Sequence, residues 1–182
     1  MAKRLCRLIL IMLLLLLPAG VAMAGGVAAP VTARFENYCL DDAIVILTQT
    51  AGVSRIICGP VGGSFTRTFD NMPLSQALEQ IARENQLIVS LKADLVVVRP
   101  AAKLPQSAYA SCSLVKLPVA DVLKAVAEAY GLQLAVRGQL KGEVSDELGG
   151  TMKEVLDALS AKYDFRWSVS RSTARVTAVQ AK

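Results

Sequence analysis

Apolar residues recur at the three- and four-residue spacing of an amphipathic helix in four segments, which form two matching pairs. The helix predicted within 39–53 matches one within 118–132, and the helix predicted within 74–89 matches one within 152–167. Both matches have nearly the same offset along the chain. The pattern therefore predicts a two-helix unit that occurs twice.

The signals at the ends of these helices also match. Gly52 and Gly131 follow the first helix of each pair, at the position where a left-handed backbone favours glycine. Thr151 and Glu154 have the spacing of a capping box at the start of the fourth helix. The helix boundaries are thus predicted by local chemistry as well as by apolar spacing.

Segments typical of β-strands surround each predicted helix pair. One extended segment precedes each pair, two short strand candidates separate its helices, and a hairpin follows it. The chain therefore predicts an α+β fold made of two tandem small βαββαββ domains. We place the first domain at 31–100 and the second, more divergent one at 110–180. A linker at 101–109, which contains Pro105 and follows Pro100, joins them.

The core of each predicted domain consists only of the apolar faces of two helices packed against short strands. A core of this size is small for a domain that must be stable alone. We therefore expect the two domains to stabilise each other through a shared interface.

The N-terminal residues have the pattern of a secretory signal peptide. Basic residues precede an unbroken apolar run at 8–17, and the small residues Ala22 and Ala24 stand where a signal peptidase cuts. We assign 1–24 to a cleaved signal peptide. The alternative is an uncleaved anchor, which Pro18 disfavours, as does a run at the lower limit of bilayer length.

The charge balance changes when this segment is removed. The whole chain has 20 basic and 15 acidic side chains, a net charge of +5. Three of the basic residues lie in 1–24, so 17 remain and the net charge falls to +2. This small excess excludes an extended nucleic-acid-binding surface. No later apolar run reaches bilayer length, so we expect no transmembrane segment after cleavage.

Export would make the cysteines informative, because disulfides form in oxidising compartments. The exported part contains Cys39, Cys58 and Cys112, an odd number. Cys39 and Cys58 flank a predicted helix and the strand after it, so a disulfide between them is one candidate arrangement. The alternative is that all three are small buried apolar side chains.

The side chains needed for catalysis are missing or poorly placed. The chain has no histidine, so a cysteine would lack its usual base and a zinc site is disfavoured. Asp41 with Asp42, and Asp146 with Glu147, are adjacent pairs that helix dipoles and solvent exposure explain more simply. We therefore predict no enzyme, no metal site and no cofactor.

The stretch from Phe35 to Pro100 resembles the STN short domain, named for the N-termini of secretins and TonB-dependent receptors. The resemblance is carried by an "F-x-x-x-x-L-x-x-AL" block at Phe69, Leu74, Ala77 and Leu78, followed by a valine-rich hairpin. The second half matches less closely. The resemblance implies a periplasmic domain that docks on other proteins and is not catalytic.

The family resemblance also suggests partners. In secretins this domain opens the periplasmic vestibule and contacts inner-membrane components, and in outer-membrane receptors it passes a signal to an anti-sigma regulator. No β-barrel, plug or secretin core follows Lys182 in this sequence. We therefore expect an accessory or adaptor protein of a secretion, pilus or outer-membrane assembly. Its partner would be a secretin or another envelope protein, and a homo-oligomer is also compatible. A truncated secretin, a receptor-type signalling domain and a periplasmic small-ligand-binding module are the alternatives.

An unpaired strand edge is the physical basis we expect for docking, because it accepts a strand of another protein. The last strand of each half is the predicted edge. In the first half the candidate residues are Leu95, Val97 and Arg99, and in the second half they are Arg175 and Thr177.

Overall fold

The computed structural model describes residues 25–92 and 94–179, so the proposed signal peptide lies outside the described residues. The helices and strands of the first half are β1 (Pro30–Cys39), α1 (Leu40–Thr50), β2 (Ser54–Cys58), β3 (Ser64–Pro73), α2 (Leu74–Asn85), β4 (Leu87–Lys92) and β5 (Leu95–Pro100). Those of the second half are β6 (Tyr109–Ser113), β7 (Leu117–Pro118), α3 (Val119–Ala129), β8 (Gln133–Arg137), β9 (Glu143–Val144), β10 (Glu147–Thr151), α4 (Met152–Lys162), β11 (Phe165–Ser170) and β12 (Thr173–Ala178).

The predicted α+β class is confirmed, and so are the helix signals. Gly52 and Gly131 both have positive φ, +67° and +68°, where they end α1 and α3. Thr151 and Glu154 form the predicted capping box of α4. The element order matches the prediction in both halves, except that the second half has an additional short antiparallel pair, β7 with β9.

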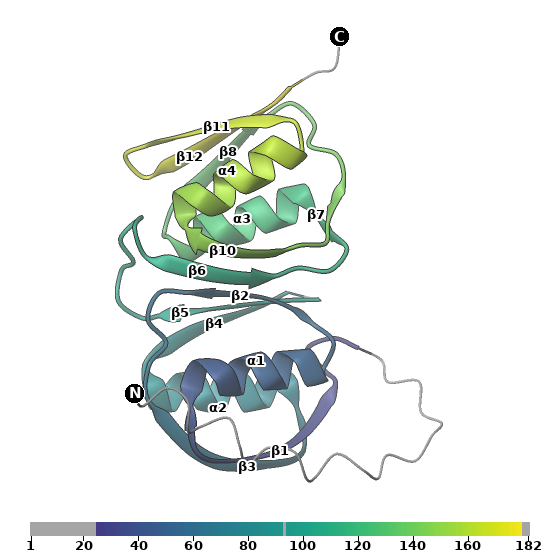
Figure 1. Ribbon diagram of the computed structural model, residues 1–182, viewed down its shortest axis with the longest axis vertical. Helices are drawn as coiled ribbons and strands as arrows, with labels where there is room; N and C mark the ends of the chain where they lie inside the picture. The colour runs from purple at the N-terminus through teal and green to yellow at the C-terminus, as the bar shows by residue number, and fades with distance from the viewer. Residues whose placement is uncertain (1–24, 93, 180–182) are drawn as a thin grey trace, which may run out of the picture.

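The elements stack in alternating layers of sheet and helix, as Figure 1 shows from bottom to top. The two-stranded sheet β1-β3 lies below α1 and α2, which in turn lie below a five-stranded sheet. Above this central sheet come α3 and α4, and above them the three-stranded sheet β11-β12-β8. Each helix pair therefore lies between two sheets, and the apolar side chains of its helices are buried against both of them.

The central sheet belongs to both halves of the chain. Its strand order is β10-β6-β2-β5-β4, so β2 of the first half pairs with β6 of the second. This pair is antiparallel, with Ile56 opposite Cys112 and Cys58 opposite Ala110. The two halves are thus joined by backbone hydrogen bonds within one sheet, and not only by side-chain contacts between two separate domains.

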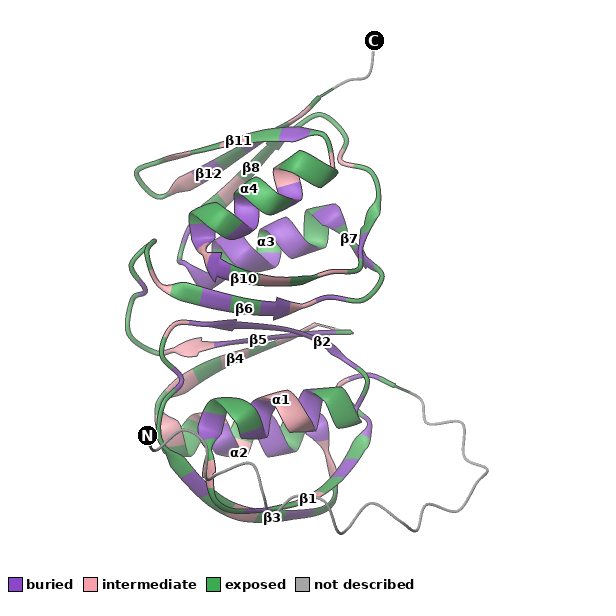
Figure 2. Cartoon of the chain, viewed as in Figure 1, coloured by how far each residue is buried: buried purple, intermediate pink, exposed green. Residues whose placement is uncertain are grey.

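The strands β2 and β5 at the centre of this sheet bury apolar side chains on both faces. Ile57, Val96 and Val98 belong to the core around α1 and α2. Four residues of β2 and β5 point the other way and belong to the core around α3 and α4: Ile56, Cys58, Leu95 and Val97. Figure 2 shows β2 buried along its length. The expected shared interface is therefore present, as a sheet with one core on each side.

The segment predicted as a linker packs onto this junction. Leu104 is buried, and a Cβ built on Gly59 would lie 2.5 Å from its Cδ2. Tyr109 is the first residue of β6 and does not belong to the connection. The predicted linker is therefore one residue too long at its C-terminal end, and at Leu104 it is packed into the junction and is not a loose connection.

Polar contacts also stabilise the junction between the halves, including the ion pair of Lys92 with Glu128 at 3.0 Å.

None of the helices in the described part of the chain has the length and apolar character needed to cross a bilayer. This finding agrees with the expectation that no transmembrane segment follows 1–24.

The shared sheet predicts that the first half alone is unstable. A chain of residues 25–108 would expose the four apolar residues of β2 and β5 that face the second half. Fully burying a large apolar side chain stabilises by ~1.5–3 kcal/mol. We therefore expect a Tm at least about 10 °C below that of residues 25–182 in thermal unfolding followed by circular dichroism.

The control for this test places on the exposed face the residues that the second half has at the same positions. These substitutions are Ile56→Ala, Cys58→Arg, Leu95→Thr and Val97→Arg. The substituted fragment should be monomeric and soluble where the parent fragment aggregates. An unsubstituted fragment that melts no lower than residues 25–182 would contradict the role of the shared sheet.

Candidate docking site

Neither strand predicted as an open edge is at an edge of its sheet. β5 lies between β2 and β4, and β12 lies between β11 and β8. Leu95 and Val97 are buried in the core of the second half, and Arg99 is half-buried. The docking prediction for these three residues is therefore wrong. It fails because the last strand of each half inserts between two others instead of adding to the end of the sheet.

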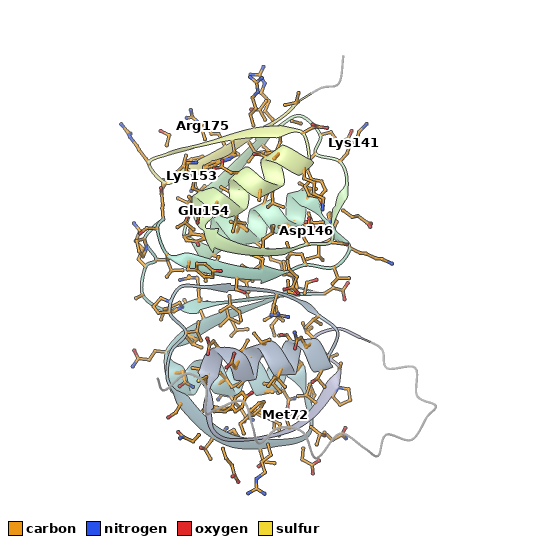
Figure 3. The ribbon with its side chains drawn as sticks, viewed as in Figure 1. Met72, Lys141, Asp146, Lys153, Glu154 and Arg175 are labelled. Carbon is orange, nitrogen blue, oxygen red and sulfur yellow. The ribbon has the colours of Figure 1, made fainter. Side chains whose placement is uncertain are left out.

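The same correction applies to the strand position of Arg175 and Thr177, but both side chains are exposed. They lie on the outer face of the three-stranded sheet, the face turned away from α3 and α4. Figure 3 shows Arg175 on this sheet, at the end of the molecule formed by the second half. The residues are accessible through their side chains and not through a free backbone edge.

Equivalent outer faces in the two halves have opposite chemistry. In the first half, Ile56 and Val97 are neighbours across β2 and β5 and are covered by the second half. The corresponding neighbours in the second half are Ala135 and Arg175, across β8 and β12, and both are exposed. One face is therefore built for burial and the other for water or for a polar partner.

Three arginines lie close together on this exposed face. Arg166 of β11 and Arg137 of β8 both pair with Thr177, which stands between them on β12. Arg175 lies two residues along β12 on the same face. The three strands contain no acidic residue, and no ion pair is formed by these arginines within the described residues. We call Arg137, Arg166 and Arg175 the arginine cluster.

β8 has the open edge that docking requires. The N–H of Gln133 donates to the carbonyl of Ser172 on the β12 side, at 2.8 Å. Because backbone groups alternate in direction along a strand, the N–H and C=O of Leu134 and Val136 face the open side. Val136 is 45% exposed, unusually high for a valine in a sheet. The equivalent side of β2 is the one that β6 occupies.

Other strands of the described residues also end their sheets, and β4, β10 and β11 do so without a register shift. β8 differs from them because the equivalent strand of the first half, β2, has an added strand on the same side. The longer edge strand β1 is irregular. β1 has two register shifts against β3, between Val31 and Ala33 and between Phe35 and Tyr38. Such bulges twist a strand and obstruct a further partner. β8 pairs with β12 over five residues without a shift. We therefore define the β8 docking site as the open edge at Leu134 and Val136 together with the arginine cluster.

Sequence reasoning missed this site because it looked for the last strand of each half. A signal was available: Ile56, Cys58 and Val97 of the first half align with Ala135, Arg137 and Arg175 of the second. The change from Cys58 and Val97 to Arg137 and Arg175 indicates which half leaves its outer sheet face uncovered. Recognising this change requires knowing that these residues are neighbours on adjacent strands, and the sequence alone does not give the register of those strands.

The candidate disulfide is not formed, since no disulfide joins Cys39 to Cys58. Cys39 is exposed at the end of β1, whereas Cys58 belongs to the core around α3 and α4, on the far side of the central sheet. The prediction of a bridge is wrong because β1 and β2 lie on opposite sides of α1. The alternative of buried apolar thiols holds for Cys58 and Cys112.

Burial controls the chemistry of these two thiols. Loss of hydration raises the pKa of Cys58 to about 12, and it raises the pKa of Cys112 to about 12 as well. Tyr130 packs beside them with its pKa also raised by burial, and its hydroxyl donates to the carbonyl of Ala108 at 2.7 Å. Protonated thiols are poor nucleophiles, so the cluster has a packing role.

Acidic pairs in the structure have ordinary partners. Asp146 accepts from Lys162 at 2.5 Å, and Glu147 accepts from the Ser113 hydroxyl at 2.8 Å. Ligand atoms of Cys39, Asp41 and Asp42 lie within 4.8 Å of one another, closer than expected for adjacent residues, but all three residues are exposed. This arrangement at the start of α1 fits the favourable helix dipole.

A hollow of about 160 Å³ lies where β4, β5 and α3 meet, lined by residues that include Arg99 and Glu128. It is smaller than the ~300–1,000 Å³ of ordinary ligand sites. Its walls come from both halves, so it is best understood as incomplete packing at their junction.

One buried arginine was not expected. Arg55 of β2 is 6% exposed, and its Nε has no hydrogen-bond partner. Its neighbour on β6 is Ser113, whose hydroxyl is already directed to Glu147. The equivalent residue on β8 is Leu134, so the fold does not require a cation here.

No family model matches the sequence, and no curated protein matches it. The fold and the β8 docking site are therefore the basis of the function proposed below.

The thiol environments predict selective labelling. In a chain of residues 25–182 at pH 8, Ellman's reagent should react with Cys39 only, because Cys58 and Cys112 are covered and protonated. In denaturant without reductant all three thiols should react. Detection of a single reactive thiol after unfolding would reveal a disulfide and contradict the structure.

The unpartnered Nε of Arg55 predicts a stabilising substitution. A buried polar group without a partner costs about 1–3 kcal/mol, and an apolar side chain of similar size removes that cost. Arg55→Leu should therefore raise the free energy of unfolding in urea by about 1 kcal/mol. Arg83→Leu on the exposed face of α2 is the matched control and should change it little. Destabilisation by Arg55→Leu would show that the guanidinium makes a stabilising contact.

Proposed function

We propose that this chain is a non-enzymatic protein-interaction module of the periplasm, which docks on an envelope protein by accepting a strand at β8. The proposal includes a cleaved signal peptide at 1–24 and two STN-like domains within one exported protein. It assigns the protein an accessory or adaptor role in a secretion, pilus or outer-membrane assembly. Its partner there would be a secretin or another component of the assembly.

The observation that carries the proposal is the pairing of β2 with β6. In the first half, the strand that follows the first helix accepts an added antiparallel strand over four residue pairs. The second half has a strand in the same place, β8, paired on one side only. A unit that accepts a strand once within the chain has the geometry to accept another from outside.

The exposed state of β8 also favours a partner. An open, regular strand edge promotes aggregation, and proteins usually bend it, shorten it or cover it. β1 has bulges, but β8 has none. Regular pairing is shared with the edge strands β4, β10 and β11, so regularity permits docking at β8, and the pairing of β2 with β6 is what favours it. The resemblance to STN domains, whose known roles are docking, points in the same direction.

A proline substitution at the open edge tests this proposal. Val136→Pro removes an N–H that faces the open side, whereas the N–H groups of Ala135 and Arg137 face β12 and are retained. Val136→Thr is the matched control, because it keeps the N–H and the β-branched shape. We expect the wild type and Val136→Thr to capture the same envelope protein from periplasmic extract, and Val136→Pro to lose it.

The contact itself is located by cross-linking. A photoreactive residue in place of Ala135 should cross-link the captured protein, and mass spectrometry should find the link within an extended segment of it. Capture that is equal for all three proteins, or cross-links confined to the first half, would refute docking at β8.

A further inference from the structure

We propose that the strand which docks on β8 is an acidic segment with alternating carboxylate and apolar side chains. This inference deepens the proposed function and rests on it. It follows from three features of the β8 docking site: the register that the fold imposes, the arginine cluster, and the exposed Val136.

The register can be transferred from the first half. There Cys112 stands opposite Ile56 and Ala110 opposite Cys58, with both side chains of β6 on the outer face. The equivalents of Ile56 and Cys58 on β8 are Ala135 and Arg137. A strand added in the same way would place two of its side chains, two residues apart, next to these positions on the outer face.

Each of the two outer side chains of the added strand would lie near an arginine. The first would lie directly beside Arg137. The other docks beside Ala135, whose methyl group is too short to separate it from Arg175 on the next strand. Neighbouring strands lie ~4.8 Å apart, so side chains two strands apart are separated by roughly 10 Å, a gap that a long arginine side chain can reach across when the residue between them is small. Both outer positions of the incoming strand therefore face a guanidinium.

The arginine cluster lacks the carboxylates that would satisfy it. Arg137, Arg166 and Arg175 form no ion pair within the described part of the chain, and the residue that pairs with both Arg137 and Arg166 is the uncharged Thr177. Arginine binds carboxylates through paired hydrogen bonds. The fold does not demand arginines here, because the first half has Cys58, Ile88 and Val97 at the equivalent positions.

The inner side of the added strand should be apolar. Between the two outer positions, one residue of the partner would stand opposite Val136, which is 45% exposed. The next inward residue would stand opposite Leu134, which is half-buried against the core of the second half. From N- to C-terminus, an antiparallel partner would therefore read acidic, apolar, acidic, apolar.

A second copy of this chain fits the site poorly. Repeating the internal junction would place apolar residues, as β6 does with Ala110 and Cys112, over the arginine cluster. The strand of a second copy that corresponds to β6 is β1, and β1 is bent by two register shifts. Charge and shape thus favour a different, acidic partner over self-association.

The test uses a capped peptide of ~8 residues, about the length of an ordinary strand, with alternating glutamate and valine. A lysine–valine peptide of the same length is its control. Binding to residues 25–182 is measured by isothermal titration, and amide NMR shifts locate the contact. We expect only the glutamate peptide to bind, with shifts at Leu134 and Val136 and with weaker binding at high salt.

Substitutions distinguish the contribution of the arginine charges to peptide binding from that of the open strand edge. Arg137→Gln with Arg175→Gln should weaken the glutamate peptide about tenfold or more, since two charge-assisted contacts are lost. Arg83→Gln with Lys124→Gln removes the same charge from exposed positions elsewhere and should change little. Val136→Pro should abolish binding and Val136→Thr should not.

The possible outcomes distinguish this inference from the proposed function. Equal binding of both peptides, or no effect of the arginine substitutions, would overturn the acidic partner, while loss on Val136→Pro would still support edge docking. Binding that is insensitive to Val136→Pro would overturn both. Two other outcomes would also overturn the inference. One is binding to phosphatidylglycerol vesicles that needs the arginines but not the edge, and the other is concentration-dependent dimerisation that Val136→Pro removes.

Discussion

The antiparallel pairing of β2 with β6 is the interaction on which the rest of this structure depends. It converts a three-stranded sheet of the first half and a two-stranded sheet of the second into one sheet of five strands. Because this sheet then has helices on both sides, β2 and β5 must be buried on both faces, and their buried side chains are apolar except for Ser54 and Arg55. A single strand pairing thus determines which side chains of the first half can be exposed.

The same pairing explains why two halves of similar construction differ in surface chemistry. The outer face of β2 and β5 is a core surface, with Ile56 and Val97 under α3. No element of the described part of the chain covers the outer face of β8 and β12, and Ala135 and Arg175 replace the apolar pair. An apolar face there would be a large exposed hydrophobic patch, which soluble proteins avoid. Solvation alone accounts for polar residues, but it does not account for three arginines that form no ion pair within the described residues.

Docking by strand addition suits a protein of this architecture. A sheet edge supplies affinity through backbone groups that are already ordered, so little conformational freedom is lost on the side of the receptor. Side chains beside the edge then select the partner. In the proposed docking mode the affinity and the selectivity would come from neighbouring parts of β8, β11 and β12. On the proposed function, a small module of this kind would recognise its partner through a strand edge and the side chains beside it.

Local features of the chain were determined by the sequence alone. Apolar spacing predicted the helices, glycines at 52 and 131 predicted their ends, and the Thr151–Glu154 pair predicted a cap, because each depends on residues within one or two turns. The edge of a sheet is not local in this sense. Whether Leu95 or Leu134 lies at an open edge depends on how strands far apart in the chain insert between one another. Only the tertiary structure decided that β5 and β12 are central, that Cys39 and Cys58 are separated by a layer of helix, and that Arg55 is buried while Arg137 and Arg175 face water.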